Sequence, residues 1–140
     1  MRWDERYSEP GFAYGKEPND YLVAMAKDIP QGKVLSLAEG EGRNAVFLAQ
    51  LGCDVTAVDL SAVGMQKAQE MARGKNLVIQ TVVMDLNDYD PGTEQWDAVV
   101  SIFCHMPPAQ RAELHRRVVQ ALKPGGVFIL EAYIPRQLEF

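Results

Sequence analysis

The feature that most constrains the fold of this chain is a regular alternation of short apolar runs with amphipathic segments. The apolar runs occupy residues 34–38, 55–60, 78–84, 96–103 and 127–133, and the third is rich in the β-branched residues that favour strands. Between several of them lie segments with a broad apolar face, at 43–51, 61–74 and 107–122. Alternating strands and helices imply right-handed βαβ units. We therefore expect an α/β fold with a doubly wound, mostly parallel sheet of about five strands and helices on both faces.

Local signals place several element boundaries. Ser61 is expected to cap a helix whose inward positions are Met65, Ala68 and Ala72. Pro107 and Pro108 suit the opening turn of another helix, and residues 123–126 form a turn signal. The polar segment 87–95 is not expected to form a full helix, whereas one helix is expected from about 19 to 27.

Length and charge limit the function classes. The chain has 140 residues, which suggests a single domain, and a net charge of -5 without a basic cluster longer than Arg116-Arg117. Nucleic acid and anionic membranes are therefore not expected as partners, since both require clustered cations. Cys53 and Cys104 stand in neither a CxxC nor a zinc spacing, so we expect no metal site and a reducing, cytoplasmic location.

The first candidate binding group follows the first strand. Residues Glu39-Gly40-Glu41-Gly42-Arg43-Asn44 contain two glycines that permit a tight turn and close approach of a ligand to the backbone. The helix that follows directs its N–H groups back toward this turn. Taken alone, the loop is either a ligand cradle or an ordinary strand-to-helix turn.

Acids end the next two strands. Asp59 can accept hydrogen bonds from ribose hydroxyls, or it can cap the following helix, a task that Ser61 can also perform. Asp85 can accept a hydrogen bond from an adenine amino group while the backbone N–H of Leu86 reaches a ring nitrogen; otherwise Asp85 is a solvated turn acid. Two acids on successive strand ends, one beside a glycine turn, predict a pocket for an adenosine nucleoside.

The fourth candidate group, Phe103-Cys104-His105, ends the fourth strand. His105 is either a proton acceptor or substrate-orienting group, and hence the candidate catalytic residue, or a structural histidine. Cys104 is interpreted as a buried small residue rather than a nucleophile.

With these motifs the chain resembles class I S-adenosylmethionine (SAM) dependent methyltransferases, in particular the small-molecule group of tellurite-resistance and thiopurine type. The resemblance rests on segments 34–45, 58–61, 85–86 and 122–126, and on the openings 3–7 and 14–19. It implies a Rossmann-like fold over residues 1–140, with a cap segment at 1–30 and a core at 31–140. It also implies SAM as cofactor, S-adenosylhomocysteine (SAH) as product, and a small-molecule methyl acceptor.

The resemblance assigns roles within that fold. Gly40 and Gly42 face the methionine part, Asp59 holds ribose, and Asp85 and Leu86 hold adenine. The methyl group and the acceptor are bordered by Tyr7, Tyr14 and His105. The cofactor site also includes Tyr14, Glu39, Asn44, Leu60 and Phe103. Where the family pattern has an acid at 36 and a glycine at 38, this chain has Ser36 and Ala38, so Glu39 is the candidate for the missing carboxylate.

Two alternatives remain open. A nicotinamide-dependent oxidoreductase satisfies the formal dinucleotide fingerprint of Gly40, Gly42, Ala45 and Asp59, but Glu39 and Glu41 would repel a pyrophosphate. A non-catalytic module that holds SAM or SAH, or an inactive fragment, is the other.

The second alternative arises because the chain shows only five of the seven strands that the resemblance implies. We therefore expect a C-terminally incomplete core. We also expect a homodimer, formed through the edge of the fifth strand or by exchange of the C-terminal segment.

Overall fold

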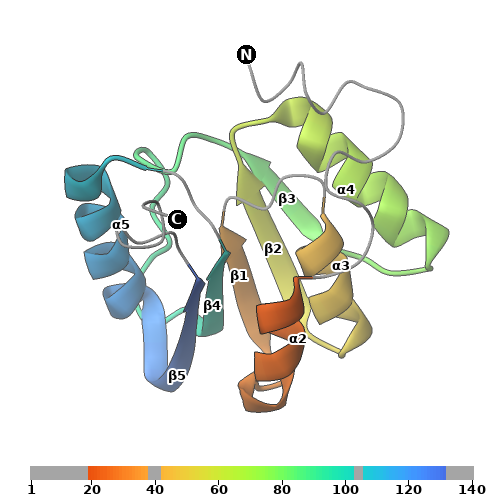
Figure 1. Cartoon of the computed structure of the whole chain (residues 1–140), viewed down its shortest axis with the longest axis horizontal. Helices are drawn as coiled ribbons and strands as arrows, with labels where there is room; N and C mark the ends of the chain where they lie inside the picture. The colour runs from red at the N-terminus through yellow and green to blue at the C-terminus, as the bar shows by residue number, and fades with distance from the viewer. Residues whose placement is uncertain (1–18, 38–41, 103–105, 132–140) are drawn as a thin grey trace, which may run out of the picture.

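A computed structural model describes residues 19–37, 42–102 and 106–131 of the chain. These residues form a five-stranded sheet in the order β3-β2-β1-β4-β5, and every neighbouring pair of strands is parallel. Figure 1 shows the sheet with β3 and β5 at its two edges. The expected α/β architecture is confirmed.

The strands agree closely with the apolar runs of the sequence. Their bounds are β1 Lys33–Leu37, β2 Asp54–Asp59, β3 Gln80–Val83, β4 Trp96–Ile102 and β5 Leu122–Glu131. The third strand is shorter than the expected run 78–84. Val78 lies outside it, and 80% of the surface of Val78 is exposed. The turn expected at 123–126 lies inside β5, where the pairing with β4 shifts in register. Trp96 pairs with Leu122, but Ala98, two residues later, pairs with Val127.

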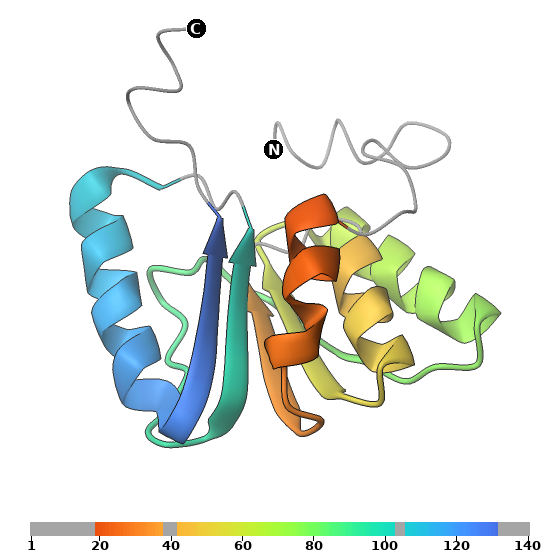
Figure 2. The same cartoon turned by 60° about the horizontal axis from the view of Figure 1, so that its bottom comes forward.

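Helices cover both faces of the sheet. On one face lie α2 (Asp20–Met25), α3 (Arg43–Gln50) and α4 (Ala62–Gly74), and on the other lies α5 (Pro108–Ala121), as the turned view shows (Figure 2). A short 3-10 helix, η1 (Ala26–Asp28), continues α2. The segment between β3 and β4 contains turns and no helix, as its polar sequence predicted.

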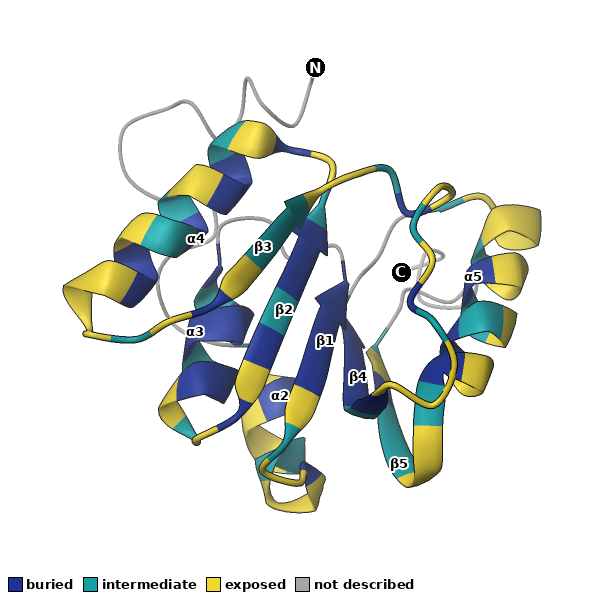
Figure 3. Cartoon of the chain, turned by 180° about the vertical axis from the view of Figure 1, so that it is seen from behind, coloured by how far each residue is buried: buried dark blue, intermediate teal, exposed yellow. Residues whose placement is uncertain are grey.

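Two apolar cores hold these layers together. The core under α3 and α4 includes Val34, Ala57 and Met65, and the core under α5 includes Leu35, Val58 and Leu114. Figure 3 shows buried residues running along β1, β2 and β4, which are the interior strands of the sheet. Burial on both faces explains why these strands are continuous apolar runs rather than alternating ones.

Candidate cofactor site at the carboxyl edge of the sheet

The strand order brings the candidate binding groups to one edge. Because β1, β2 and β3 are parallel neighbours, the residues that follow them emerge at the same edge. The chain then returns to the other side of β1 to form β4, so the order of the strands switches between β1 and β4. In open α/β sheets, ligands bind beyond the carboxyl ends of the strands near such a switch.

Asp59 ends β2 with its carboxylate fixed by the backbone. The N–H of Ser61 donates a 2.9 Å hydrogen bond to Asp59 Oδ1. Ser61 itself is the N-cap of α4, since its hydroxyl accepts a 3.0 Å hydrogen bond from the N–H of Gly64. The capping role that sequence left open between the two residues therefore belongs to Ser61.

Asp85 repeats this arrangement one strand further on. The N–H of Asn87 donates a 2.9 Å hydrogen bond to Asp85 Oδ1, and the N–H of Asp88 donates to the Asp85 carbonyl at 2.9 Å. The Asp85 carboxylate is thereby held in a tight turn, and its second oxygen, Oδ2, has no hydrogen-bond partner among the described residues. The acids that follow or end two adjacent strands are thus each oriented by the N–H two residues later.

Gly42 is required by packing as well as by its conformation. It is the N-cap of α3 with φ of 98°, a value that favours glycine. A Cβ at this position would lie 2.4 Å from the Cβ of Ala68 in α4. The missing side chain of Gly42 therefore allows α3 and α4 to meet.

Asn44 occupies the first turn of α3 and is 7% exposed. Its Oδ1 accepts a 2.8 Å hydrogen bond from the backbone N–H of Asn19, whose side-chain amide donates to Glu131 Oε1 at 3.1 Å. Asn19 also caps α2 through its own Oδ1, which accepts from the N–H of Leu22. The sequence motifs did not point to Glu131 as part of this edge. Asn19 had two signals, its place in the opening 14–19 that resembles the family and the helix expected from about residue 19, but neither predicted its contact with Asn44.

Apolar side chains near the two acids differ in their exposure. Leu60 directly follows Asp59 and is 42% exposed, and Met84 directly precedes Asp85 and is 39% exposed. Leu86, by contrast, is buried in the core beneath α5. The edge thus combines oriented carboxylates with accessible apolar surface, which suits a ligand with hydroxyl groups and a flat base.

The remaining predicted site residues lie outside the described residues: Tyr7, Tyr14, Glu39, Gly40, Phe103 and His105. Within the described part of the chain, no group of three or more His, Cys, Asp or Glu side chains is arranged to hold a metal ion. Across the same residues, no helix is long and apolar enough to cross a membrane.

The fold is that of an open α/β domain, a class whose members take ligands at the carboxyl ends of their strands. A family described as the methyltransferase domain matches residues 34–126. The chain belongs to this family. The expected class, a SAM-dependent methyltransferase domain, is thereby confirmed.

Three similar proteins illustrate the relationship. The glycine/sarcosine N-methyltransferase of Halorhodospira halochloris is 29% identical over 92% of this chain and 47% of its own length. TehB of Haemophilus influenzae is 36% identical over 61% of this chain and 29% of its own length. The solved DhpI–SAM–HEP complex has a TM-score of 0.69 and 29% identity, covering 99% of this chain and 66% of that one. The chain thus spans less than half the length of the glycine/sarcosine N-methyltransferase and of TehB.

Proposed function

We propose that this protein binds SAM at the carboxyl edge of its sheet and transfers the methyl group to a small-molecule acceptor by in-line displacement, with SAH as product. The observation that carries the proposal is the matched pair Asp59 and Asp85. Asp59 ends β2 and Asp85 lies two residues after the neighbouring strand β3, and each carboxylate accepts a 2.9 Å hydrogen bond from the N–H two residues later.

The residues of this edge fit the chemistry of an adenosine cofactor. In this proposal, Asp59 accepts hydrogen bonds from the ribose hydroxyls, and Asp85 with the N–H of Leu86 holds adenine. Leu60 offers exposed apolar surface beside the base. Gly40 and Gly42, with Glu39 and Asn44, hold the methionine part.

SAM supplies a methyl group on sulfonium, which is a good leaving group. The protein's task is therefore to bring two ligands together in line and to exclude water, so positioning supplies much of the rate. Tyr7, Tyr14 and His105 are proposed to border the acceptor, with His105 orienting it or receiving its proton.

The environment proposed for the protein is the cytoplasm, and its partner a small molecule rather than nucleic acid. Cys53 is a free, buried thiol, and burial raises its pKa above the usual value. Such a thiol is inert rather than reactive, which suits a reducing compartment. The net charge of -5 disfavours a polyanionic partner.

A holder of SAM or SAH without turnover is the second candidate function, because the edge acids that carry the proposal support cofactor binding rather than turnover. Titration calorimetry with SAH and with NADH tests the shared part of both proposals: we expect SAH to bind and NADH not to bind. Binding of NADH alone would replace them with a nicotinamide-dependent activity. Turnover of SAM with a panel of thiol, selenide and amine acceptors then separates an enzyme from a holder.

A further inference from the structure

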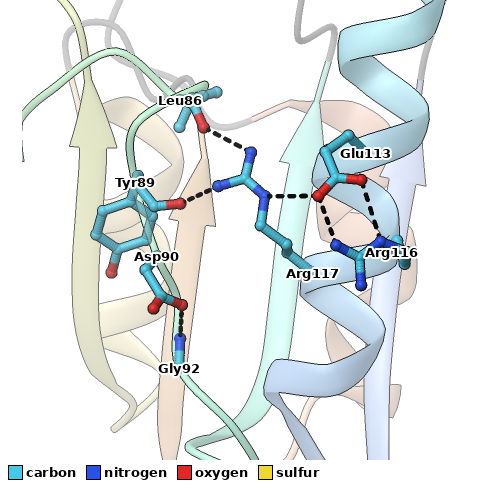
Figure 4. A network of polar contacts seen from close by, with 7 residues as sticks. All are labelled: Leu86, Tyr89, Asp90, Gly92, Glu113, Arg116 and Arg117. Atoms are coloured by element: carbon cyan, nitrogen blue, oxygen red, sulfur yellow. Dashed lines mark hydrogen bonds and ion pairs between the residues drawn. The ribbon is translucent and has the colours of Figure 1, made fainter.

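Arg117 reaches from α5 to the segment that follows β3. Its Nη2 donates a 3.2 Å hydrogen bond to the carbonyl of Leu86, and its Nη1 donates a short hydrogen bond to the carbonyl of Tyr89. Figure 4 shows the guanidinium between these two carbonyls on one side and Glu113 on the other. Arg117 thus links the helix on one face of the sheet to the turn that carries Asp85.

The guanidinium is well placed to fix this turn. Its side chain is only 19% exposed, and Glu113 Oε1 lies 3.9 Å from its buried Nε. The planar guanidinium presents its donors in a rigid fork, so two carbonyls bonded to it are held at a fixed separation. A lysine ammonium has no such fork.

The segment after β3 needs partners of this kind because it forms no helix, and its internal turn bonds satisfy only some of its backbone groups. Arg117 supplies partners at Leu86 and Tyr89. Side chains of Asn87 and Gln110 add a 3.1 Å hydrogen bond between the same segment and α5, but this contact is exposed. The Arg117 contacts are therefore the more sheltered link between the turn and the helix.

We infer that Arg117 is a positioning residue for cofactor binding: it holds the Asp85–Leu86 turn in the conformation that receives the adenine of SAM. This inference rests on the proposed function. It predicts that Arg117 acts on cofactor affinity through Asp85 and Leu86, without touching the cofactor itself.

The adjacent arginine provides a matched control. Arg116 lies on the same helix and carries the same charge, but it is 58% exposed and bonds only to Glu113 among the described residues. Arg117→Gln and Arg116→Gln therefore change the net charge equally. Only the first removes the hydrogen bonds to Leu86 and Tyr89.

The experiment is calorimetric titration of SAH into the full chain and these variants. We expect Arg117→Gln to weaken SAH binding about tenfold, a typical consequence of losing hydrogen bonds to a charged group, and Arg116→Gln to leave it near the wild-type value. Arg117→Lys is expected to retain only part of the affinity. In the ligand-free protein, hydrogen exchange at the amides of Asn87 and Asp88 is expected to accelerate in Arg117→Gln alone.

Double variants separate positioning from general stability. In an Asp85→Ala background the effect of Arg117→Gln on SAH affinity is expected to shrink, because only the N–H of Leu86 then remains to be positioned, whereas in an Asp59→Ala background it is expected to persist in full. An equal loss in both backgrounds, or SAH binding unchanged by Arg117→Gln, would overturn the inference. If Arg117→Gln does not fold, Arg117→Lys enters the same comparison. Failure of the wild-type protein to bind SAH would instead overturn the proposed function and this inference together.

Discussion

The backbone N–H of Asn19 donates a 2.8 Å hydrogen bond to the side-chain oxygen of Asn44, which lies 25 residues later in the chain. Through its side-chain amide, Asn19 also bonds Glu131 at the carboxyl end of β5. One residue therefore connects the start of α2, the first turn of α3 and the end of an edge strand. These three points lie together at the carboxyl edge of the sheet, where we propose that SAM binds.

The bond between Asn19 and Glu131 can be tested by exchanging the donor and the acceptor between the two side chains. Asn19→Asp keeps an acceptor for the N–H of Leu22 but places a carboxylate against Glu131, and we expect it to destabilise the fold by about 1–2 kcal/mol. Adding Glu131→Gln restores a donor opposite the new acid and is expected to recover most of that loss. Urea unfolding midpoints measure both effects, with Asn19→Ser as the variant that keeps the cap without adding charge. Wild-type stability of Asn19→Asp would show that the junction does not matter.

Asp59 is expected to dominate cofactor affinity. Asp59→Ala removes a charged acceptor from the ribose hydroxyls, so SAH binding should weaken by about 1.5–3 kcal/mol in calorimetry. Asp54→Ala is the control, because Asp54 is an exposed acid at the opposite end of the same strand. The ribose assignment fails if the two variants bind SAH equally well.

Much of the fold could be predicted from sequence because its signals are local. Ser61 caps α4 as predicted, and the inward positions Met65, Ala68 and Ala72 are at most 2% exposed. A cap depends on a residue and the few that follow it, and an inward face depends on helical spacing. Both can be read without knowing the tertiary structure.

The contacts that organise the candidate site could not be predicted in the same way. Arg117 lies 31 residues from Leu86, and Asn19 lies 112 residues from Glu131. Neither pair follows a periodic pattern, so only the folded chain brings its members together. Likewise Gly42 was predicted as a glycine for ligand approach, whereas the structure adds its close contact with Ala68.

Gly42→Ala is expected to destabilise the fold by at least about 1 kcal/mol, because alanine disfavours a φ of 98° and its Cβ would lie 2.4 Å from that of Ala68. Gly74→Ala is the matched change: Gly74 is at the end of α4, and a Cβ there meets nothing within 4 Å. We expect this second variant to be neutral or slightly more stable. Thermal unfolding of the two proteins makes the comparison, and equal melting temperatures would contradict the packing argument.

His115 should make stability depend on pH. It packs edge-on against Phe128 with ring centroids 5.4 Å apart, and desolvation, with a contribution from Arg111, lowers its pKa below the usual 6.5. The unfolded chain therefore binds a proton more readily than the folded one. Its stabilising contribution is fully present above pH 6.5 and is lost as pH falls through the lowered folded pKa.

The test of this linkage uses His115→Phe, which keeps an aromatic ring but cannot titrate. Between about pH 7.5 and about pH 5.5, the urea midpoint of unfolding should fall further for the wild-type protein than for the variant, since only the wild type takes up this proton on unfolding. Parallel declines in the two proteins would show that other groups control the acid response. A larger decline in the variant would reverse the sign of the argument.

The outer edge of β5 is expected to mediate self-association. Among the described residues β5 pairs only with β4, so its other side presents backbone N–H and C=O groups that can template pairing with a second strand. Leu130 on this strand is 38% exposed, and a lysine there would blunt the edge with charge and remove apolar surface. Val119→Lys adds the same charge on α5 at a position that is 66% exposed, and so controls for net charge alone.

Sedimentation velocity over a range of concentrations should show a concentration-dependent dimer for the wild type and for Val119→Lys, and a monomer for Leu130→Lys. A wild-type protein that stays monomeric at high concentration would exclude this edge as an interface, and a dimer that survives Leu130→Lys would place the interface elsewhere.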